Sequence, residues 1–251
     1  MERIVFWLTR DFGALLGVFP PNLPHRHFTI QITVSDEVFQ AHLGGQILES
    51  RSLLIASNVD HAIHCASGQR MLVMNVNPLS LLGLWSKQQL KGQAFIEQPN
   101  ELLLDIWKSA KQLIGEEEAA YKFEQLVQQS LSNATKSEEP FGLDLRIQAC
   151  LKLLYAAPNP PSATEMAAKL FLSESRFLHL FKSETGLTYR RMILWFRLEK
   201  SLRCYQQFNS LTELAHHCGF ADSAHYARTF KETFGVKPSA LLQKNSRFIQ
   251  A

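Results

Sequence analysis

Two stretches of the chain, residues 164–186 and 212–235, carry the same pattern, and this repeat restricts the fold more than any other feature of the sequence. The first stretch reads TEMAAKLFLSESRFLHLFKSETG and the second reads TELAHHCGFADSAHYARTFKETFG. The opening Thr-Glu-apolar-Ala segments lie 48 residues apart, and after one inserted residue the matching aromatic, lysine and glycine positions lie 49 apart. A repeat of this kind indicates that one small structural unit is used twice.

Each copy is predicted to fold as a short helix, a tight turn and a second helix. In the first copy Ser173 caps the second helix and Gly186 ends it, and in the second copy Gly219 permits the turn and Asp222 caps the helix. Such a pair of helices is the helix-turn-helix unit, whose second helix enters the DNA major groove. A generic helical bundle also has aromatic residues at i and i+4, but two copies in register on a basic background favour the DNA-binding unit.

The segments LSESRFLHLFKSETGLTYRRMILWFRLEKS (172–201) and LTELAHHCGFADSAHYARTFKETFGVKPSALL (211–242) resemble the DNA-binding domain of the AraC/XylS family of bacterial transcription regulators. Gly219-Phe220, the FKETFGVKPS run and Arg197-Leu198 carry the most specific part of this resemblance. The resemblance covers residues 141–245, about two fifths of the chain. It implies an all-α domain in which a long helix joins two helix-turn-helix units that bind double-stranded DNA.

The charges divide unevenly between the two parts of the 251-residue chain. Residues 141–251 hold 15 lysines and arginines against 8 acidic residues, whereas residues 1–140 hold 11 against 15. A basic part that also contains the repeat suits a polyanionic partner. The four cysteines form no C-x-x-C pair, and no signal-like segment or run of about 18 apolar residues is present, so we expect a cytoplasmic protein without a membrane segment.

Residues 1–77 are predicted to form an antiparallel β-barrel. Turn signals such as Pro20-Pro21-Asn22, Gly44-Gly45 and Ser57-Asn58 separate short apolar or alternating segments. The segments expected as strands are 4–8, 28–34, 39–43, 52–56, 62–65 and 71–76. Many short strands at close spacing are typical of a barrel or sandwich. The family resemblance implies a cupin-like sensory barrel here, so the predicted fold class is α+β, with this barrel and a helical segment ahead of the all-α domain.

Residues 78–132 are predicted to be a helical association segment, 133–140 (NATKSEEP) a linker, and 141–251 the DNA-binding domain. The helical segment carries apolar stripes at helical spacing. The residues of these stripes are Leu79, Leu82, Trp85, Leu103, Ile106, Trp107, Ala110, Leu113, Ile114, Phe123, Leu126, Val127 and Leu131. The stripes either cover the barrel or form a dimer contact, and their spacing does not distinguish the two interpretations.

One expected strand has a row of polar side chains on one face. His25, His27, Thr29, Gln31 and Thr33 alternate with apolar residues. If this row faces the inside of the barrel, it lines a small-ligand pocket with His61 or His64 nearby; if it faces outward, it is a solvated surface. The candidate ligand-binding residues are therefore His25, His27, Gln31, His61 and His64.

A metal site is the sharper interpretation of the same histidines. Cupin enzymes use an H-x-H pair, a glutamate shortly after it and a distant histidine, and His25, His27 and His61 match all but the glutamate. Gln31 stands at that position and is a poor ligand, although three neutral imidazoles can hold Zn²⁺ or Fe²⁺. With no second shell evident in the sequence, we predict no metal, no cofactor and no enzymatic activity. A metal-dependent cupin enzyme fused to a DNA-binding domain is the rival hypothesis.

The predicted DNA-reading surface consists of side chains that point away from the core of each unit. They are Ser175, Arg176, Leu178, His179, Lys182, Arg190 and Arg191 with the first unit, and Ser223, Ala224, His225, Ala227, Arg228 and Lys231 in the second. Arg228 is the best candidate for bidentate contact with guanine. The resemblance implies a structural role for Arg197, which we expect in a buried ion pair. A connecting helix over 188–207 would be about 30 Å long, close to one turn of B-DNA.

These features together predict a transcriptional regulator, and the resemblance favours an activator. The expected partners are double-stranded DNA, a small-molecule effector of the barrel, RNA polymerase and a second copy of the chain. A constitutive regulator, whose barrel is only a scaffold or a protein-interaction module, is the second alternative, and a rigid, filled barrel interior would favour it.

Overall fold

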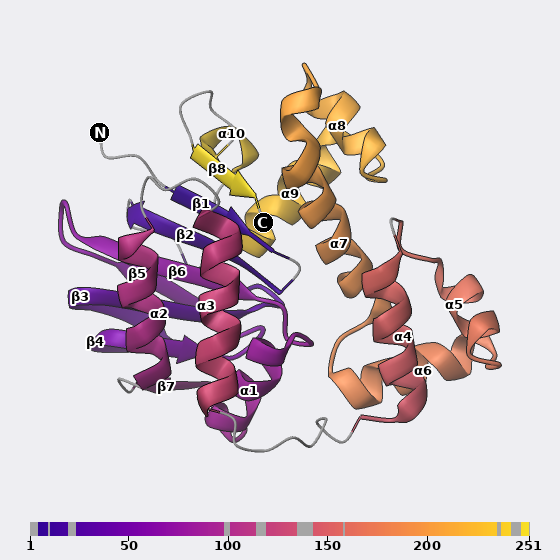
Figure 1. Ribbon diagram of the computed structural model, residues 1–251, viewed down its shortest axis with the longest axis horizontal. Helices are drawn as coiled ribbons and strands as arrows, with labels where there is room; N and C mark the ends of the chain where they lie inside the picture. Colours follow the sequence, from indigo (N-terminus) through magenta and orange to yellow (C-terminus); the bar gives the residue numbers. More distant parts are fainter. Residues whose placement is uncertain are drawn as a thin grey trace.

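The computed structural model describes residues 5–9, 11–19, 24–97, 101–113, 119–134, 143–157, 159–234, 237–241 and 247–250. Most of the predicted linker, residues 135–140, lies outside these ranges, as do Ile114 and Gly235. An N-terminal β-sheet with helices against one face is followed by a C-terminal all-α part (Figure 1). The predicted α+β fold class is confirmed.

The sheet has the strand order β7-β4-β3-β6-β2-β1-β8, and β5 pairs with β3. Its strands are β1 (Val5–Leu8), β2 (Phe12–Val18), β3 (Ile30–Leu43), β4 (Gln46–Ile55), β5 (His61–His64), β6 (Arg70–Val76), β7 (Phe95–Glu97) and β8 (Arg247–Gln250). All pairs are antiparallel except β1 and β8, where the C-terminal strand runs parallel to the first one. Among the described strands no pairing joins β7 to β8, so hydrogen bonds do not close the sheet into a barrel.

The sheet differs from the strands predicted by sequence in two places. The segments 28–34 and 39–43 belong to one long strand, β3, whose register against β4 shifts between Val34 and Phe39. The break predicted between these two segments is therefore a bulge, which bends a strand without ending it. β2 was not predicted from the sequence. It pairs with β1 and β6, and its burial is nearly continuous because Leu15 packs in one apolar cluster and Phe12, Ala14 and Leu16 in another, so the strand shows no alternation.

Three helices cover one face of the sheet, as Figure 1 shows for α2 and α3. They are α1 (Leu81–Leu90), α2 (Glu101–Gln112) and α3 (Ala119–Ala134). Their apolar stripes share one buried cluster with Ile30, Ile32 and Val34 of β3. Trp7 of β1 stacks on Phe123 of α3 at a ring distance of 4.9 Å. The apolar stripes thus pack against the sheet of the same chain, and they no longer argue for a dimer contact.

The C-terminal part consists of short helices at both ends of a longer one, α7 (Tyr189–Cys204) (Figure 1). The others are α4 (Leu145–Ala156), α5 (Ala163–Lys169), α6 (Glu174–Thr185), α8 (Leu211–His217), α9 (Ser223–Phe234) and α10 (Pro238–Leu241). Local sequence sets their ends: Ser162 and Glu165 form a capping box on α5, and Ser173 caps α6. Gly186 and Gly219 have φ of +74° and +80°, as predicted for the two turns.

The connecting helix is shorter than predicted. α7 has 16 residues, about 24 Å at 1.5 Å per residue, and a 3₁₀ turn follows over Tyr205–Gln207. The length of α7 alone therefore does not span one turn of B-DNA, and the placement of α6 and α9 against its ends must supply the rest.

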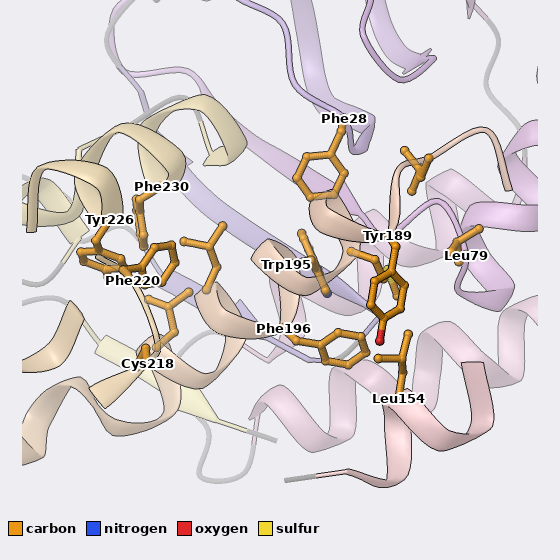
Figure 2. Packing of buried hydrophobic residues seen from close by; sticks show 14 of the residues in the cluster. Phe28, Leu79, Leu154, Tyr189, Trp195, Phe196, Cys218, Phe220, Tyr226 and Phe230 are labelled. Atoms are coloured by element: carbon orange, nitrogen blue, oxygen red, sulfur yellow. The ribbon is translucent and has the colours of Figure 1, made fainter. Parts of the chain in front are cut away.

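Apolar contacts join the C-terminal helices to the sheet. Phe6, Phe28 and Leu79 from the N-terminal part belong to the same buried cluster as the aromatic residues of α6, α7 and α9. Figure 2 shows Phe28 directed at Trp195 of α7, and the two rings meet edge to face at 6.1 Å. Phe6 makes a similar contact with Phe234 of α9 at 5.9 Å. The two parts of the chain share one apolar core in this arrangement.

Three side-chain hydrogen bonds flank this apolar contact. Asn77 Nδ2 donates to Tyr155 Oη at 2.8 Å. Lys87 Nζ donates to the carbonyl of Thr185 at 3.1 Å, at the C-terminal end of α6. Burial lowers the pKa of Lys87, but its position at a helix C-terminus favours a positive charge. Arg191 Nη1 donates to Asn58 Oδ1 at 2.8 Å.

Gly83→Ala is expected to destabilise the protein although alanine is the better helix former. A Cβ at Gly83 in α1 would overlap the Asn77 carbonyl oxygen and lie 2.8 Å from two backbone atoms of Pro78. Such overpacking costs about 1–3 kcal/mol. Chemical denaturation should show lower stability than wild type, whereas Gln88→Ala on the exposed side of α1 should not. Unchanged or higher stability of Gly83→Ala would contradict this packing.

Asp11→Asn is expected to stabilise the protein at neutral pH. Burial, and then the negative charge of Glu124, raise the pKa of Asp11 to about 6. Because this exceeds the usual unfolded value of about 4, stability is greatest below pH 4 and falls as the pH rises through 6. Denaturant titrations should find the variant more stable by about 1–3 kcal/mol at pH 7.5 and close to wild type at pH 4. Asp60→Asn, at an exposed position, controls for the loss of one carboxylate.

Candidate DNA-binding surface and interdomain pocket

The helix α6 exposes the residues predicted to read DNA in the first unit. Phe177 and Phe181 are fully buried against Tyr189 of α7, with ring distances of 4.9 and 5.3 Å. This packing turns the opposite side of the helix outward. The predicted residues that it exposes are Ser175, Arg176, Leu178, His179 and Lys182.

The helix α9 has the same arrangement in the second unit. Asp222 Oδ1 accepts from the backbone N–H of His225 at 2.6 Å, which satisfies a donor in the first turn of the helix. Tyr226, Thr229 and Phe230 are buried. Among the predicted reading residues Ala224, Arg228 and Lys231 are exposed, while Ser223, His225 and Ala227 are half-buried.

Two arginines at the start of α7 are exposed, and a third in its middle is half-buried. Arg190 and Arg191 lie on the surface as predicted, and Arg191 donates to Asn58 beside β5. The expected buried ion pair of Arg197 is wrong, because this side chain forms no ion pair with any described residue. Its guanidinium packs instead on the turn between α8 and α9, where a Cβ at Gly219 would lie 3.1 Å from Arg197 Nε.

A pocket of about 520 Å³ lies between the sheet and the DNA-binding part. Its lining residues are His25, Arg26, His27, Phe28 and Asn58 from the N-terminal part, and Arg191, Leu194, Arg228, Thr229, Lys231, Glu232 and Thr233 from α7 and α9. Three of the predicted DNA contacts, Arg191, Arg228 and Lys231, thus face the sheet. The same cations that are candidates for DNA binding line a pocket with an apolar floor at Phe28 and Leu194.

The polar row of β3 faces the interior of the curved sheet. His27, Thr29, Gln31 and Thr33 are all at most 5% exposed, and His25 is half-buried. Beyond them the interior is filled by an apolar cluster that includes Phe39, Ile55, Ile63 and Met71. The described pocket therefore opens at the end of the sheet that faces α7 and α9, and only His25 and His27 of the row line it.

The buried polar side chains bond to one another. His27 Nε2 and His61 Nε2 each lie 3.0 Å from Gln31 Oε1, and Thr29 Oγ1 donates to Asn75 Oδ1 at 3.2 Å. Burial lowers the pKa of His27 to about 4 and that of His61 to about 3, so both rings are neutral at pH 7. His64 does not join them: it lies on the opposite face of β5 and stacks on His42 at 4.6 Å.

A family model described as a helix-turn-helix domain matches residues 166–244, most of both copies of the repeat. The chain is 26% identical over 198 residues to the probable transcriptional regulator LumQ of Photobacterium leiognathi, which covers 74% of this chain and 76% of LumQ. It is 34% identical over 88 residues to the transcriptional activator RhaS of Escherichia coli O157:H7, of which it spans 32%. These matches identify the chain as a transcriptional regulator with an AraC-type DNA-binding domain.

The fold of this regulator is similar to that of ToxT from Vibrio cholerae. The apo form of a ToxT variant superposes with a TM-score of 0.56 at 11% identity, covering 93% of this chain and 97% of that one. A second ToxT structure from this species gives 0.52 at 12% identity. At such identity the likeness concerns the fold alone, an N-terminal antiparallel sheet followed by a helical DNA-binding domain.

Asn58, Leu194 and Glu232 line the interdomain pocket but were not predicted from the sequence as site residues. Asn58, whose φ of +63° is one that asparagine tolerates, was read only as a turn. Outside the pocket, the hydrogen bond of Thr29 to Asn75 joins residues 46 positions apart. No local pattern signals such pairings.

None of the helices in the described parts of this regulator is both long and apolar enough to cross a membrane.

Proposed function

We propose that this regulator binds specific DNA sites through α6 and α9 and that a small anionic ligand controls this binding from the interdomain pocket. The observation that carries the proposal is the position of Arg228 and Lys231. They lie on the outward side of the second reading helix and also line the pocket against His25 and Asn58. A ligand and DNA would then use the same cations, which links the two binding events.

In the DNA complex, base contacts would come from the exposed sides of α6 and α9. Arg228 is suited to guanine O6 and N7, and His179 to a base edge. The apolar side chains Leu178 and Ala224 would touch thymine methyl groups, next to Ser175, Ser223, His225 and Ala227. Phosphate contacts would come from the remaining cations, namely Arg176, Lys182, Arg190, Arg191 and Lys231.

The pocket chemistry favours an anion with an apolar part. Arg191, Arg228 and Lys231 supply positive charge, and Phe28 and Leu194 supply apolar surface. A ToxT structure of similar fold, with a TM-score of 0.51, is described as bound to an unsaturated fatty acid. A carboxylate ligand in the pocket of this regulator would hold α9 against the sheet, and its loss would release the reading helix by a shift in population.

The proposal also includes activation of transcription. RhaS is named an activator, which favours activation, and hence contact with RNA polymerase in the cytoplasm. Self-association stays a prediction, because the stripes of α2 and α3 pack on the sheet. The filled interior of the sheet fits the alternative of a constitutive regulator, so ligand binding decides between the two functions.

Arg228→Ala should weaken specific DNA binding by about 1–3 kcal/mol and relax the preference at one base position. Binding-site selection with the full chain, followed by titrations at several salt concentrations, measures both effects. Lys182→Ala is the matched control in the other unit: it should weaken binding to all sequences alike and lower the salt slope by about one. An equal loss on all sequences for Arg228→Ala would reduce its role to a phosphate contact.

Thermal melting of the full chain against carboxylates of increasing apolar size tests the sensing function. A ligand that binds only the folded state raises the melting temperature with its concentration. The repeat provides a matched pair of variants: Lys231→Gln should abolish the shift, and Lys182→Gln, at the equivalent position outside the pocket, should retain it. No shift with any carboxylate, or the same shift in both variants, would favour the constitutive regulator.

A further inference from the structure

We propose that His25, His27 and His61 bind a divalent transition-metal ion at the end of the sheet that faces the DNA-binding part, with the Gln31 amide oxygen as a fourth ligand. Such a site goes beyond the expectation of no metal from the sequence, and it does not depend on the proposed carboxylate ligand. It rests on three observations: the convergence of the ring nitrogens, the hydrogen bonds on the outer side of two rings, and the position of the Gln31 oxygen.

The three imidazoles already lie close together. One ring nitrogen from each histidine lies within 4.8 Å of the others, and the ring centroids are 4.5 to 5.6 Å apart. Zinc–nitrogen bonds of about 2.0–2.1 Å in a tetrahedron require nitrogens about 3.3 Å apart. Small side-chain rotations would close the remaining distance. Three strand and loop positions thus bring together the ligand type that Zn²⁺, Fe²⁺ and Cu²⁺ prefer.

Backbone acceptors fix which nitrogen of two rings carries the proton. His61 Nδ1 lies 2.9 Å from the Val59 carbonyl, and His27 Nδ1 lies 3.1 Å from the Thr29 carbonyl. A carbonyl oxygen only accepts, so His61 Nδ1 carries the hydrogen. His27 Nδ1 also lies 2.7 Å from Thr29 Oγ1, and because that hydroxyl donates to Asn75 Oδ1 it accepts from the ring, so His27 Nδ1 carries the hydrogen too. Both Nε2 atoms then present a lone pair. A histidine that donates its outer N–H to a backbone carbonyl is the usual second shell of a metal ligand. The sequence had given no sign of this shell.

Both lone pairs point at one atom. His27 Nε2 and His61 Nε2 each lie 3.0 Å from Gln31 Oε1, so three acceptors meet with no donor between them. Gln31 Nε2 is held in turn by Thr33 Oγ1 at 3.0 Å, which directs the amide oxygen toward the rings. A metal ion satisfies all three acceptors together.

A turned Gln31 amide is the alternative without metal. Its NH₂ group would then donate to both Nε2 atoms, and Thr33 Oγ1 would donate to its oxygen. The metal site and the turned amide predict opposite effects of Gln31→Glu on metal affinity. A carboxylate improves a metal site, because it is a stronger ligand than an amide. Without metal the same carboxylate faces two lone pairs and has no hydrogen to offer.

The site would remain open on one side. His25 and His27 line the interdomain pocket, and their partner His61 is 1% exposed on the inner side. With neutral ligands only, the ion keeps its full positive charge beside Arg191, Arg228 and Lys231. The charge of the ion would therefore attract an anion into the pocket. The metal would add to the positive charge that draws an anion between the sheet and α9.

The test uses untagged full-length protein, stripped with a chelator and titrated with Zn²⁺ and with Co²⁺ as a spectroscopic probe. We expect one equivalent to bind, with a raised melting temperature and the visible absorption of four-coordinate Co²⁺. Gln31→Glu should bind metal about tenfold more tightly and be less stable than wild type after stripping. His64→Asn is the matched control from the nearby His42–His64 pair and should bind as wild type does.

Three outcomes would overturn the proposal. The first is the absence of a Co²⁺ spectrum and of a Zn²⁺-dependent shift in both wild type and Gln31→Glu. The second is weaker metal binding by Gln31→Glu than by wild type, which would assign Gln31 to the turned amide. The third is loss of the bound ion in His64→Asn with retention in His61→Gln, which would assign binding to the other histidine pair. The Gln31→Glu variant tests the proposal through tighter metal binding. The test therefore remains valid even if His61→Gln fails to fold.

Discussion

The edge-to-face packing of Trp195 holds the parts of this regulator in their observed arrangement. Its ring lies 6.1 Å from Phe28 of the N-terminal part and 6.1 Å from Phe234 of α9, so one side chain of α7 contacts both. At the first residue of α7, Tyr189 packs on Phe177 and Phe181 and donates to the Pro161 carbonyl at 2.8 Å. The orientation of both helix-turn-helix units relative to each other and to the sheet depends on these aromatic contacts along one helix.

The interdomain pocket lies directly beside the apolar contact between the two parts of the chain. Phe28 belongs to both: it packs on Trp195 and forms part of the pocket lining next to His27. Interfaces between domains are typically small enough that relative motion is the default. A ligand that joins His25 or Asn58 to Arg228 or Lys231 would add its binding energy to the aromatic contacts. The ligand would change DNA binding by favouring one arrangement of the sheet and the DNA-binding part over another. No change inside either helix-turn-helix unit is needed.

Local interactions were predictable from the sequence, and distant ones were not. The capping box of Ser162 and Glu165, the cap of Ser173 and the turn at Gly219 involve residues a few positions apart, so their patterns are visible in the sequence. The bulge after Val34 and the parallel pairing of β8 with β1 depend on partners elsewhere in the chain. The direction of the polar row stayed open for the same reason, since both faces of β3 are buried and alternation then loses its meaning.

The buried polar row itself argues for a function at the mouth of the sheet. Thr29 and Thr33 are 0% exposed and Gln31 is 3% exposed, and apolar residues of similar volume at these positions would avoid the cost of burying polar groups. A few residues further along β3 the same interior is apolar, with Phe39 and Ala41. The interior side chains therefore change from apolar to polar along the strand, and the polar ones lie at the end that faces α7 and α9. Departures from an apolar core concentrate where a protein binds or reacts, and here that end is the one in contact with the DNA-reading helix.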